Sequence, residues 1–229
     1  MNTIIGAIAQ PIGWVLSLIY GLVGNYGIAI IIFTLLVKLL LFPLYAKQIK
    51  STAKMSQLSP KMKAIQQKYA NDKTTLNIKM QEFYKEEKFN PAAGCLPMLI
   101  QMPIIFGVFA LLRQPLLYMD SDMLFAVHES FLWMLDLSQP DKWILPILAG
   151  IATYFSFLTT NNKNAPTQAG MEGMMKMMKY IFPLMIVLMG RSFAAGLSIY
   201  WFFGQFIQIF FNLYLGKYRN NLKKEGGKK

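Results

Sequence analysis

Five long apolar runs, separated by polar segments that carry turn residues, dominate the hydropathy pattern of this chain. The runs cover residues 23–44, 93–115, 143–160, 177–191 and 195–215. A helix needs about 20 apolar residues to cross the hydrocarbon core of a bilayer. The pattern therefore predicts an all-α polytopic membrane protein with five transmembrane helices, of which spans two to five and their loops fill residues 91–216.

Residues 1–22 are uncharged and mostly apolar, and their isoleucines, such as Ile8 and Ile12, recur at helical spacing. Trp14 is suited to the headgroup level of a membrane. The segment predicts an interfacial amphipathic helix. A sixth span is the alternative, and Pro11 together with a two-residue turn before the next run weighs against it.

Residues 45–90 are polar and rich in lysine, with two apolar stripes at helical spacing. The first stripe consists of Met55, Leu58, Met62, Ile65 and Tyr69, and the second of Leu76, Met80 and Phe83. Ser59-Pro60 has the residue types that begin a helix, and Asn71-Asp72 those of a turn. We therefore expect a cytoplasmic antiparallel helical hairpin.

The charge distribution orients the chain in the membrane. The formal net charge is +12, with hydrophobic residues at 55% and a mean hydropathy of +0.37. Most of the 23 lysines and arginines fall in residues 45–90, in the loop before the fourth span and in the basic tail 217–229. By the positive-inside rule these segments are cytoplasmic, so the N-terminus is predicted outside and the C-terminus inside. The opposite loop, with His128 and several carboxylates, is expected to be solvated.

Signatures of catalysis are scarce. His128 and Cys95 are single residues of their type, and the HExxH, Walker and GxSxG patterns are missing from the sequence. The sequence therefore predicts no enzymatic activity, no metal site and no cofactor.

One full charge, Lys38, falls within the first apolar run. Burying an ammonium at that depth costs about 3 kcal/mol on insertion scales, so it needs a partner, a water-filled cavity or a way out. None of the 11 acidic residues falls within a predicted span. Thr34 lies one helical turn away on the same face as Lys38.

Other spans carry polar stripes that reach the half of the membrane in which Lys38 lies. The polar residues are Gln101 in the second span, Thr153, Ser156 and Thr160 in the third, and Trp201, Gln205, Gln208 and Asn212 in the fifth. Facing lipid, these groups would leave donors and acceptors unpaired. We expect them to line a hydrophilic groove that is open to the cytoplasm and to lipid and is closed on the outer side, where Lys38 attracts acidic groups of a substrate.

Simpler interpretations stay open for three of these residues. The Lys38 side chain could extend to the headgroups instead of facing a groove. Gln101 could only hydrogen-bond a neighbouring helix. Trp201 could belong to the aromatic belt near the outer surface.

Three motifs resemble those of a known family. They are the run NPAAGCLPMLIQMP at residues 90–103, the run AGLSIYW at residues 195–201, and a basic residue, Lys38, followed by LLLFP. Together they closely resemble the YidC/Oxa/Alb membrane protein insertases, over about residues 20 to 219. The chain looks like the short bacterial form, which has no large extracytoplasmic domain.

The resemblance implies a bacterial plasma-membrane protein that inserts and folds membrane proteins without nucleotide hydrolysis. Two groove positions of the family match Gln101 and Trp201. The groove arginine of the family falls on Lys38, which keeps the charge but loses the planar five-donor fork. The usual proline of the Pro-Ala-Gly-Leu motif is Ala194 here, which we expect to loosen the turn into the last span.

The cytoplasmic parts suggest contacts with partners. Four methionines near the membrane, Met171, Met174, Met175 and Met178, form a soft surface for apolar nascent segments, or simply the end of a helix. The tail, with Lys217, Arg219, Lys223 and Lys224, is suited to ribosomal RNA or to anionic lipid headgroups. The expected partners are nascent membrane proteins, the ribosome, the Sec translocon and anionic lipids, with the chain acting as a monomer.

Two other functions compete with insertion. A small-anion transporter or channel would need polar residues through the outer half of the spans, where residues 28–33 are apolar. A purely structural scaffold for other membrane proteins would tolerate single substitutions of the groove residues.

Overall fold

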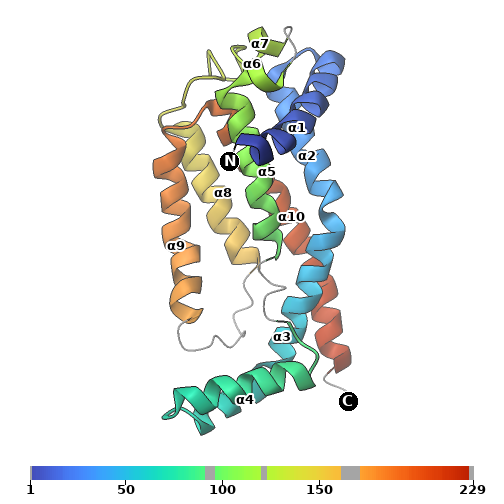
Figure 1. Ribbon diagram of the computed structural model, residues 1–229, viewed down its shortest axis with the longest axis vertical. Helices are drawn as coiled ribbons and strands as arrows, with labels where there is room; N and C mark the ends of the chain where they lie inside the picture. The colour runs from blue at the N-terminus through green and yellow to red at the C-terminus, as the bar shows by residue number, and fades with distance from the viewer. Residues whose placement is uncertain (1, 91–95, 120–122, 161–170, 227–229) are drawn as a thin grey trace.

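The computed structural model describes residues 2–90, 96–119, 123–160 and 171–226. These residues form helices, with no strand among them beyond one isolated bridge between Phe131 and Met134. The helices, in chain order, are α1 (Asn2–Val23), α2 (Tyr26–Leu40), α3 (Phe42–Lys68), α4 (Lys73–Glu86), α5 (Leu96–Arg113), α6 (Pro115–Tyr118), α7 (Met123–Ala126), α8 (Ile144–Thr160), α9 (Met171–Gly190) and α10 (Ala195–Gly226). The all-α prediction is confirmed for the described part of the chain. Figure 1 shows α2, α5, α8, α9 and α10 as an elongated bundle, with α3 and α4 at one end.

The bundle is apolar outside and partly polar inside. Large apolar side chains are exposed at helical spacing, for example Ile147, Ile151 and Phe155 on α8. Polar side chains are buried instead, namely Thr34, Lys38, Thr153, Ser156, Ser198 and Asn212 among others. A surface of this kind suits a lipid environment. Exposing apolar side chains to lipid has no free-energy cost, whereas exposing unpaired polar groups to lipid has a large one.

A tight turn at Gly24-Asn25 joins α1 to α2. Gly24 has a φ of 62°, a left-handed conformation that glycine adopts without strain, and its N–H donates to the Tyr20 carbonyl at 2.7 Å. The Asn25 side chain then caps α2 by accepting from the Ile28 N–H at 3.0 Å. The turn is therefore made where the sequence suggested it.

The first apolar run is not one straight helix. It ends as α2 at Leu40 and continues, after a bend of 50°, as the first turns of α3. Pro43 lies in the first turn of α3, where its missing N–H costs nothing. Helix α3 therefore begins inside the predicted first span and extends to Lys68 without a new start.

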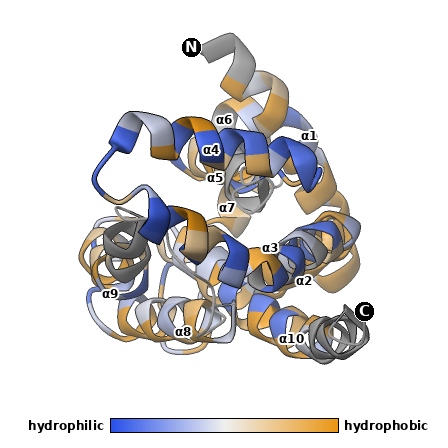
Figure 2. Ribbon diagram, turned by 90° about the horizontal axis from the view of Figure 1, so that it is seen from below, coloured by the Kyte–Doolittle hydropathy of each residue, from blue (hydrophilic) through white to orange (hydrophobic). Residues whose placement is uncertain are grey.

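Helix α4 follows the turn after Lys68 and packs against the second half of α3 (Figures 1 and 2). Leu58 and Met62 of α3 are buried against Met80 and Phe83 of α4, as the two sequence stripes predicted. Figure 2 shows hydrophilic and hydrophobic residues alternating along these two helices. The prediction that Ser59-Pro60 begins a helix is wrong, because Pro60 lies inside α3. The burial of apolar residues on both sides of Pro60 holds the helix together there.

Only one described helix is both long and apolar enough to cross a bilayer by itself, Ile5–Val23 of α1. The bent pair Tyr26–Leu40 and Phe42–Gln48 also passes if it is counted as one span, and the apolar stretches Gln101–Arg113, Ile144–Thr160 and Met177–Gly190 are shorter. Helix α1 packs against α5 and α2, obliquely across the end of the bundle in Figure 1. The number of spans, and whether α1 lies on or in the membrane, stay predictions.

Two carboxylates in the described part of the loop between α5 and α8 bind backbone groups at helix N-termini, whereas the sequence predicted a solvated loop. Glu129 accepts a hydrogen bond from the Tyr26 N–H at 2.8 Å and another from the Tyr20 hydroxyl, so it holds the beginning of α2. Asp141 accepts from the backbone N–H groups of Trp143 and Ile144 at 2.9 and 3.1 Å, and so caps α8. The expectation is corrected for these two residues, because free N–H groups at helix N-termini attract carboxylates.

Candidate functional site

The Lys38 side chain lies inside the bundle, near the end of α2, and is only 5% exposed. Its amine donates to the Tyr45 hydroxyl at 3.2 Å and to Gln208 Oε1 at 3.3 Å. It also lies 5.1 Å from the centroid of the Tyr45 ring, which is within cation–π range. The amine is therefore held by neutral groups from α3 and α10.

The hydrogen bonds continue from Tyr45 to α5 and back to α10. The Tyr45 hydroxyl is 3.5 Å from Gln101 Oε1, and Gln101 Nε2 donates to the Tyr200 hydroxyl at 2.7 Å. Gln101 thus makes the interhelical contact that was one of its two predicted roles, and it does so next to Lys38.

On the other side of Lys38 the hydrogen bonds lead to α8. Gln208 Nε2 donates to Asn212 Oδ1 at 3.1 Å, and Asn212 Nδ2 donates to Thr160 Oγ1 at 2.7 Å. Asn212 Nδ2 is also 3.2 Å from the Ser156 carbonyl oxygen. The connected polar side chains of α2, α3, α5, α8 and α10 form one cluster, called here the Lys38 cluster: Lys38, Tyr45, Gln101, Tyr200, Gln208, Asn212, Thr159 and Thr160.

Five predicted groove residues have side chains outside the Lys38 cluster, namely Thr34, Thr153, Ser156, Trp201 and Gln205. Thr34 is fully buried, and its hydroxyl donates to the Ile30 carbonyl of its own helix at 2.7 Å. The Trp201 indole donates to Thr153 Oγ1 at 3.0 Å, which links α10 to α8 inside the bundle. Gln205 is partly exposed, with no hydrogen bond recorded to another described residue.

Lys38 has no carboxylate partner among the described residues, whose ion pairs are Lys61–Glu87, Lys79–Glu82 and His128–Asp136. All three pairs lie outside the bundle interior. A buried ammonium is costly without a counter-charge, so the environment of Lys38 is an unusual one for a charged group. A water-filled groove beside it stays a prediction.

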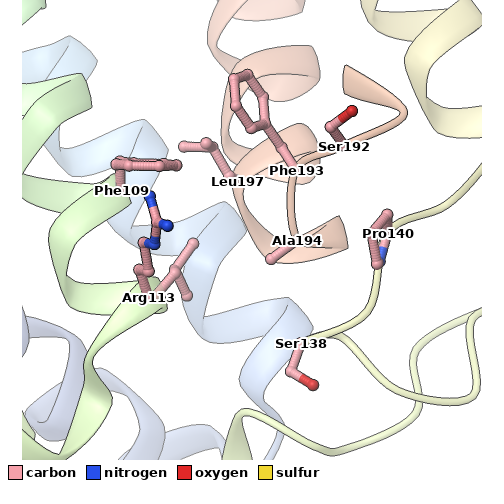
Figure 3. A pocket seen from close by; sticks show the side chains of 9 residues that line it. Phe109, Arg113, Ser138, Pro140, Ser192, Phe193, Ala194 and Leu197 are labelled. Carbon is pink, nitrogen blue, oxygen red and sulfur yellow. The ribbon is translucent and has the colours of Figure 1, made fainter. Parts of the chain in front are cut away.

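A cavity of about 450 Å³ lies at the other end of the bundle, between α5 and the turn that leads from α9 into α10 (Figure 3). Phe109, Arg113, Ser138, Phe193 and Leu197 are among its lining residues. Lys38 contacts α10 about 16 Å further along the helix axis, at Gln208. The cavity is therefore separate from the Lys38 cluster.

Ala194, where the family resemblance implies a proline, lies in the turn into α10. The turn is tied to the loop before α8, because the Ala195 N–H donates to the Gln139 carbonyl at 2.9 Å and the Gly196 N–H to the Leu137 carbonyl at 3.1 Å. These bonds supply the first N–H groups of α10 with acceptors.

Two further groups of predicted contact residues lie outside the described side chains. They are Met171, Met174 and Met175, and the tail residues Lys217, Arg219, Lys223 and Lys224; Met178 is partly exposed. Sequence reasoning in turn missed Tyr45 and Tyr200. Tyr45 lies seven residues after Lys38, which is a helical spacing. Because Pro43 lies between the two residues and Tyr45 begins a polar segment, the sequence pattern placed Tyr45 in a different element.

Comparison with known proteins places the chain among membrane proteins. The family model described as 60Kd inner membrane protein matches residues 18–224. A protein named Membrane protein insertase YidC from Fusobacterium nucleatum is 40% identical over 210 residues, which cover 91% of this chain and 95% of the relative. A protein of the same name from Francisella philomiragia is 39% identical over 202 residues, but this chain spans only 34% of its length.

A solved structure has a similar fold. It is described as an active YidC insertase crystal structure with the first transmembrane domain resolved, and it matches with a TM-score of 0.64 and 32% sequence identity. The match covers 89% of this chain and 45% of the solved chain. From the family model, the relatives and the shared fold, the chain belongs to the YidC/Oxa/Alb family of membrane protein insertases.

Proposed function

We propose that this chain inserts membrane proteins into a bacterial plasma membrane, and that the Lys38 cluster receives the hydrophilic flank of the substrate. The observation that carries the proposal is a buried ammonium whose hydrogen-bond partners, Tyr45 and Gln208, are neutral. A carboxylate makes a stronger, charge-assisted hydrogen bond with an ammonium than a neutral oxygen does. An acidic substrate group can therefore replace either partner.

The proposed path begins on the cytoplasmic side. The flank of a substrate segment reaches Lys38 between α2, α5 and α10, while the apolar part of the segment passes to lipid. Transfer of that part into lipid supplies the driving force, at about 0.8 kcal/mol for each buried methylene group. Polar groups at mid-depth shorten the apolar distance that the hydrophilic flank has to cross.

The orientation and the partners belong to the same proposal. Five spans with the N-terminus outside would put the α3–α4 hairpin and the basic end of α10 in the cytoplasm. Nascent chains would arrive there, with the ribosome or anionic headgroups held by lysines of the tail. The small-anion transporter gains no support from an observation in the described structure.

Substitution of Lys38 tests the proposal in proteoliposomes, with a single-span reporter that has an acidic translocated flank. Loss of the positive charge in Lys38→Ala or Lys38→Glu is expected to slow insertion about tenfold. A factor of about ten corresponds to the free energy that a hydrogen bond to a charged group contributes. Lys38→Arg, which keeps the charge, is expected to retain most of the rate. Protease protection of the flank gives the inserted fraction.

Lys47→Ala is the matched control, because Lys47 is an exposed lysine on α3. Photocrosslinkers at positions 38, 101 and 205 should also capture a stalled nascent chain. Wild-type insertion by both Lys38→Ala and Lys38→Glu would contradict the proposed role of the amine. Loss of insertion with no crosslink from any of the three positions would locate the substrate path elsewhere.

A further inference from the structure

We propose that Tyr45 is the positioning residue for Lys38: it holds the amine inside the bundle and blocks the route by which the side chain would extend to the cytoplasmic membrane surface. The inference rests on the proposed function of Lys38 and identifies the residue on which the depth of its charge depends.

A lysine at this position needs a neighbouring residue that holds its amine in place. Its stem has four flexible carbons, and its ammonium gains hydration whenever the stem can extend to water. Lys38 lies two residues before the last residue of α2, so the end of the helix is within reach of the stem. Without an obstacle, the ammonium would move toward the headgroups.

Tyr45 lies on that route. It belongs to the first turns of α3, just beyond the 50° bend that follows α2. Its side chain is 4% exposed and covers the amine with the ring, 5.1 Å from the centroid, and with the hydroxyl, 3.2 Å away. The bend is what turns a residue seven positions along the chain back toward Lys38.

The Tyr45 hydroxyl has a defined orientation. Because the Lys38 amine can only donate, the hydroxyl oxygen accepts from it and the hydroxyl proton is directed to Gln101 Oε1, 3.5 Å away. The Gln101 amide is fixed in turn, since its nitrogen donates to the Tyr200 hydroxyl at 2.7 Å. The acceptor lone pairs of Tyr45 therefore face the amine.

The Tyr45 ring is also held in place. It contacts the Phe211 ring of α10, with 6.2 Å between centroids. Phe42, one turn earlier in α3, packs edge-on against the same Phe211 ring at 5.0 Å. These contacts keep the ring from swinging away from the amine.

Chemical labelling of the amine tests this placement without any insertion assay. The full chain in lipid nanodiscs is treated with a water-soluble acetylating reagent, and mass spectrometry gives the acetylation of Lys38 relative to that of exposed Lys47. Tyr45→Ala is expected to raise this ratio about tenfold, which corresponds to about 1.4 kcal/mol. Tyr45→Phe keeps the ring and loses the hydroxyl, so it should give a smaller increase.

Tyr214→Phe, which alters an exposed tyrosine on α10, is the control and should leave the ratio at the wild-type value. A wild-type ratio in both Tyr45 variants would overturn the proposal, and the phenylalanine variant keeps the test valid if the alanine variant does not fold. Higher acetylation with unchanged insertion would support the placement and count against the proposed role of Lys38. Failure of the proposal for Tyr45 and failure of the proposed role of Lys38 therefore give different results.

Discussion

At the scale of single residues, the neutral surroundings of Lys38 would be an advantage for the role that we propose for its amine. A carboxylate of the same chain would form a buried ion pair, and an acidic substrate group would then have to displace a charged competitor. Tyr45 and Gln208 satisfy the ammonium with weaker bonds, at 3.2 and 3.3 Å. The charge is thus retained at depth and stays available.

Asp141 provides a prediction at the same scale. Burial alone would raise the pKa of its carboxyl, but hydrogen bonds from the Trp133 indole and from the backbone of Trp143, Ile144 and Leu145 lower the pKa below the ordinary value of 3.8. A carboxyl with a lowered folded-state pKa stabilises the fold above its unfolded-state pKa and loses this effect as the pH falls through the lowered value. Replacement by Asn removes the charge at the N-terminus of α8 and is therefore expected to lower the stability by about 0.5 kcal/mol at neutral pH, since the carboxyl is mostly exposed to solvent.

The stability difference between wild type and Asp141→Asn at neutral pH should disappear at an acidic pH below the lowered folded-state pKa of Asp141, where both side chains are uncharged. Thermal unfolding in detergent micelles, at neutral pH and at that acidic pH, measures this stability difference. Glu86→Gln, at an exposed carboxyl on α4, is the control. A difference that is the same at both pH values would show that the charge of Asp141 is not what stabilises α8.

At the scale of helices, the contact between α8 and α9 depends on a small residue. A Cβ atom added at Gly150 would lie 2.4 Å from Val187 Cγ2 and 3.1 Å from the Pro183 carbonyl oxygen. The first distance is shorter than real Cβ contacts and the second is tighter than most of them, so the Val187 side chain or the helix backbones would have to shift. Close helix approach at small residues is typical of packing within membranes, where there is no hydrophobic force between helices.

Gly150→Ala is accordingly expected to lower the stability by about 1 to 3 kcal/mol, the usual cost of overpacking. The additional substitution Val187→Ala removes the clashing methyl group and should recover part of the loss. Gly21→Ala is the control, since a Cβ atom there has no other atom within 4 Å. If the costs of Gly150→Ala and Val187→Ala simply add, the two residues are not in the contact described.

The same scale explains the composition of the candidate site. Lys38 and Tyr45 belong to different helices, and the bend between α2 and α3 brings their side chains together. Helical periodicity assigns each residue to a face of its own helix, but it contains no information on the angle at a break. Gln101 and Gln208 were expected near Lys38 because their depth could be counted along their own spans.

At the scale of the whole molecule, the described residues contain two separate apolar cores. The larger core joins the bundle with α1, whereas the smaller core lies within the α3–α4 hairpin and includes Leu58, Met62, Met80 and Phe83. Two separate cores favour two units that open independently, because a unit opens when its own buried contacts are lost.

Met80→Ala tests this independence. Met80 is 1% exposed, and removing such a side chain from a core costs about 2 to 5 kcal/mol. The loss of stability should be confined to the hairpin. Hydrogen exchange should therefore become faster in peptides of α3 and α4 and stay unchanged in those of α8 and α10. Ile78→Ala, at a 52% exposed position on α4, should change neither. Faster exchange throughout the chain would show that the cores unfold together.

The amino-acid sequence by itself determined the helical class, the positions of the apolar runs and the family, because run length, periodicity and motifs are properties of neighbouring residues. It also singled out Lys38, Gln101, Gln208 and Asn212 as polar residues within apolar runs, and the structure brings these four into one hydrogen-bonded cluster. Only the tertiary structure decided that Tyr45 covers the amine, that Trp201 bonds to Thr153, and that Glu129 holds the beginning of α2. These contacts join residues of different helices and loops, and the bends and packing angles that create them arise only when the whole bundle forms.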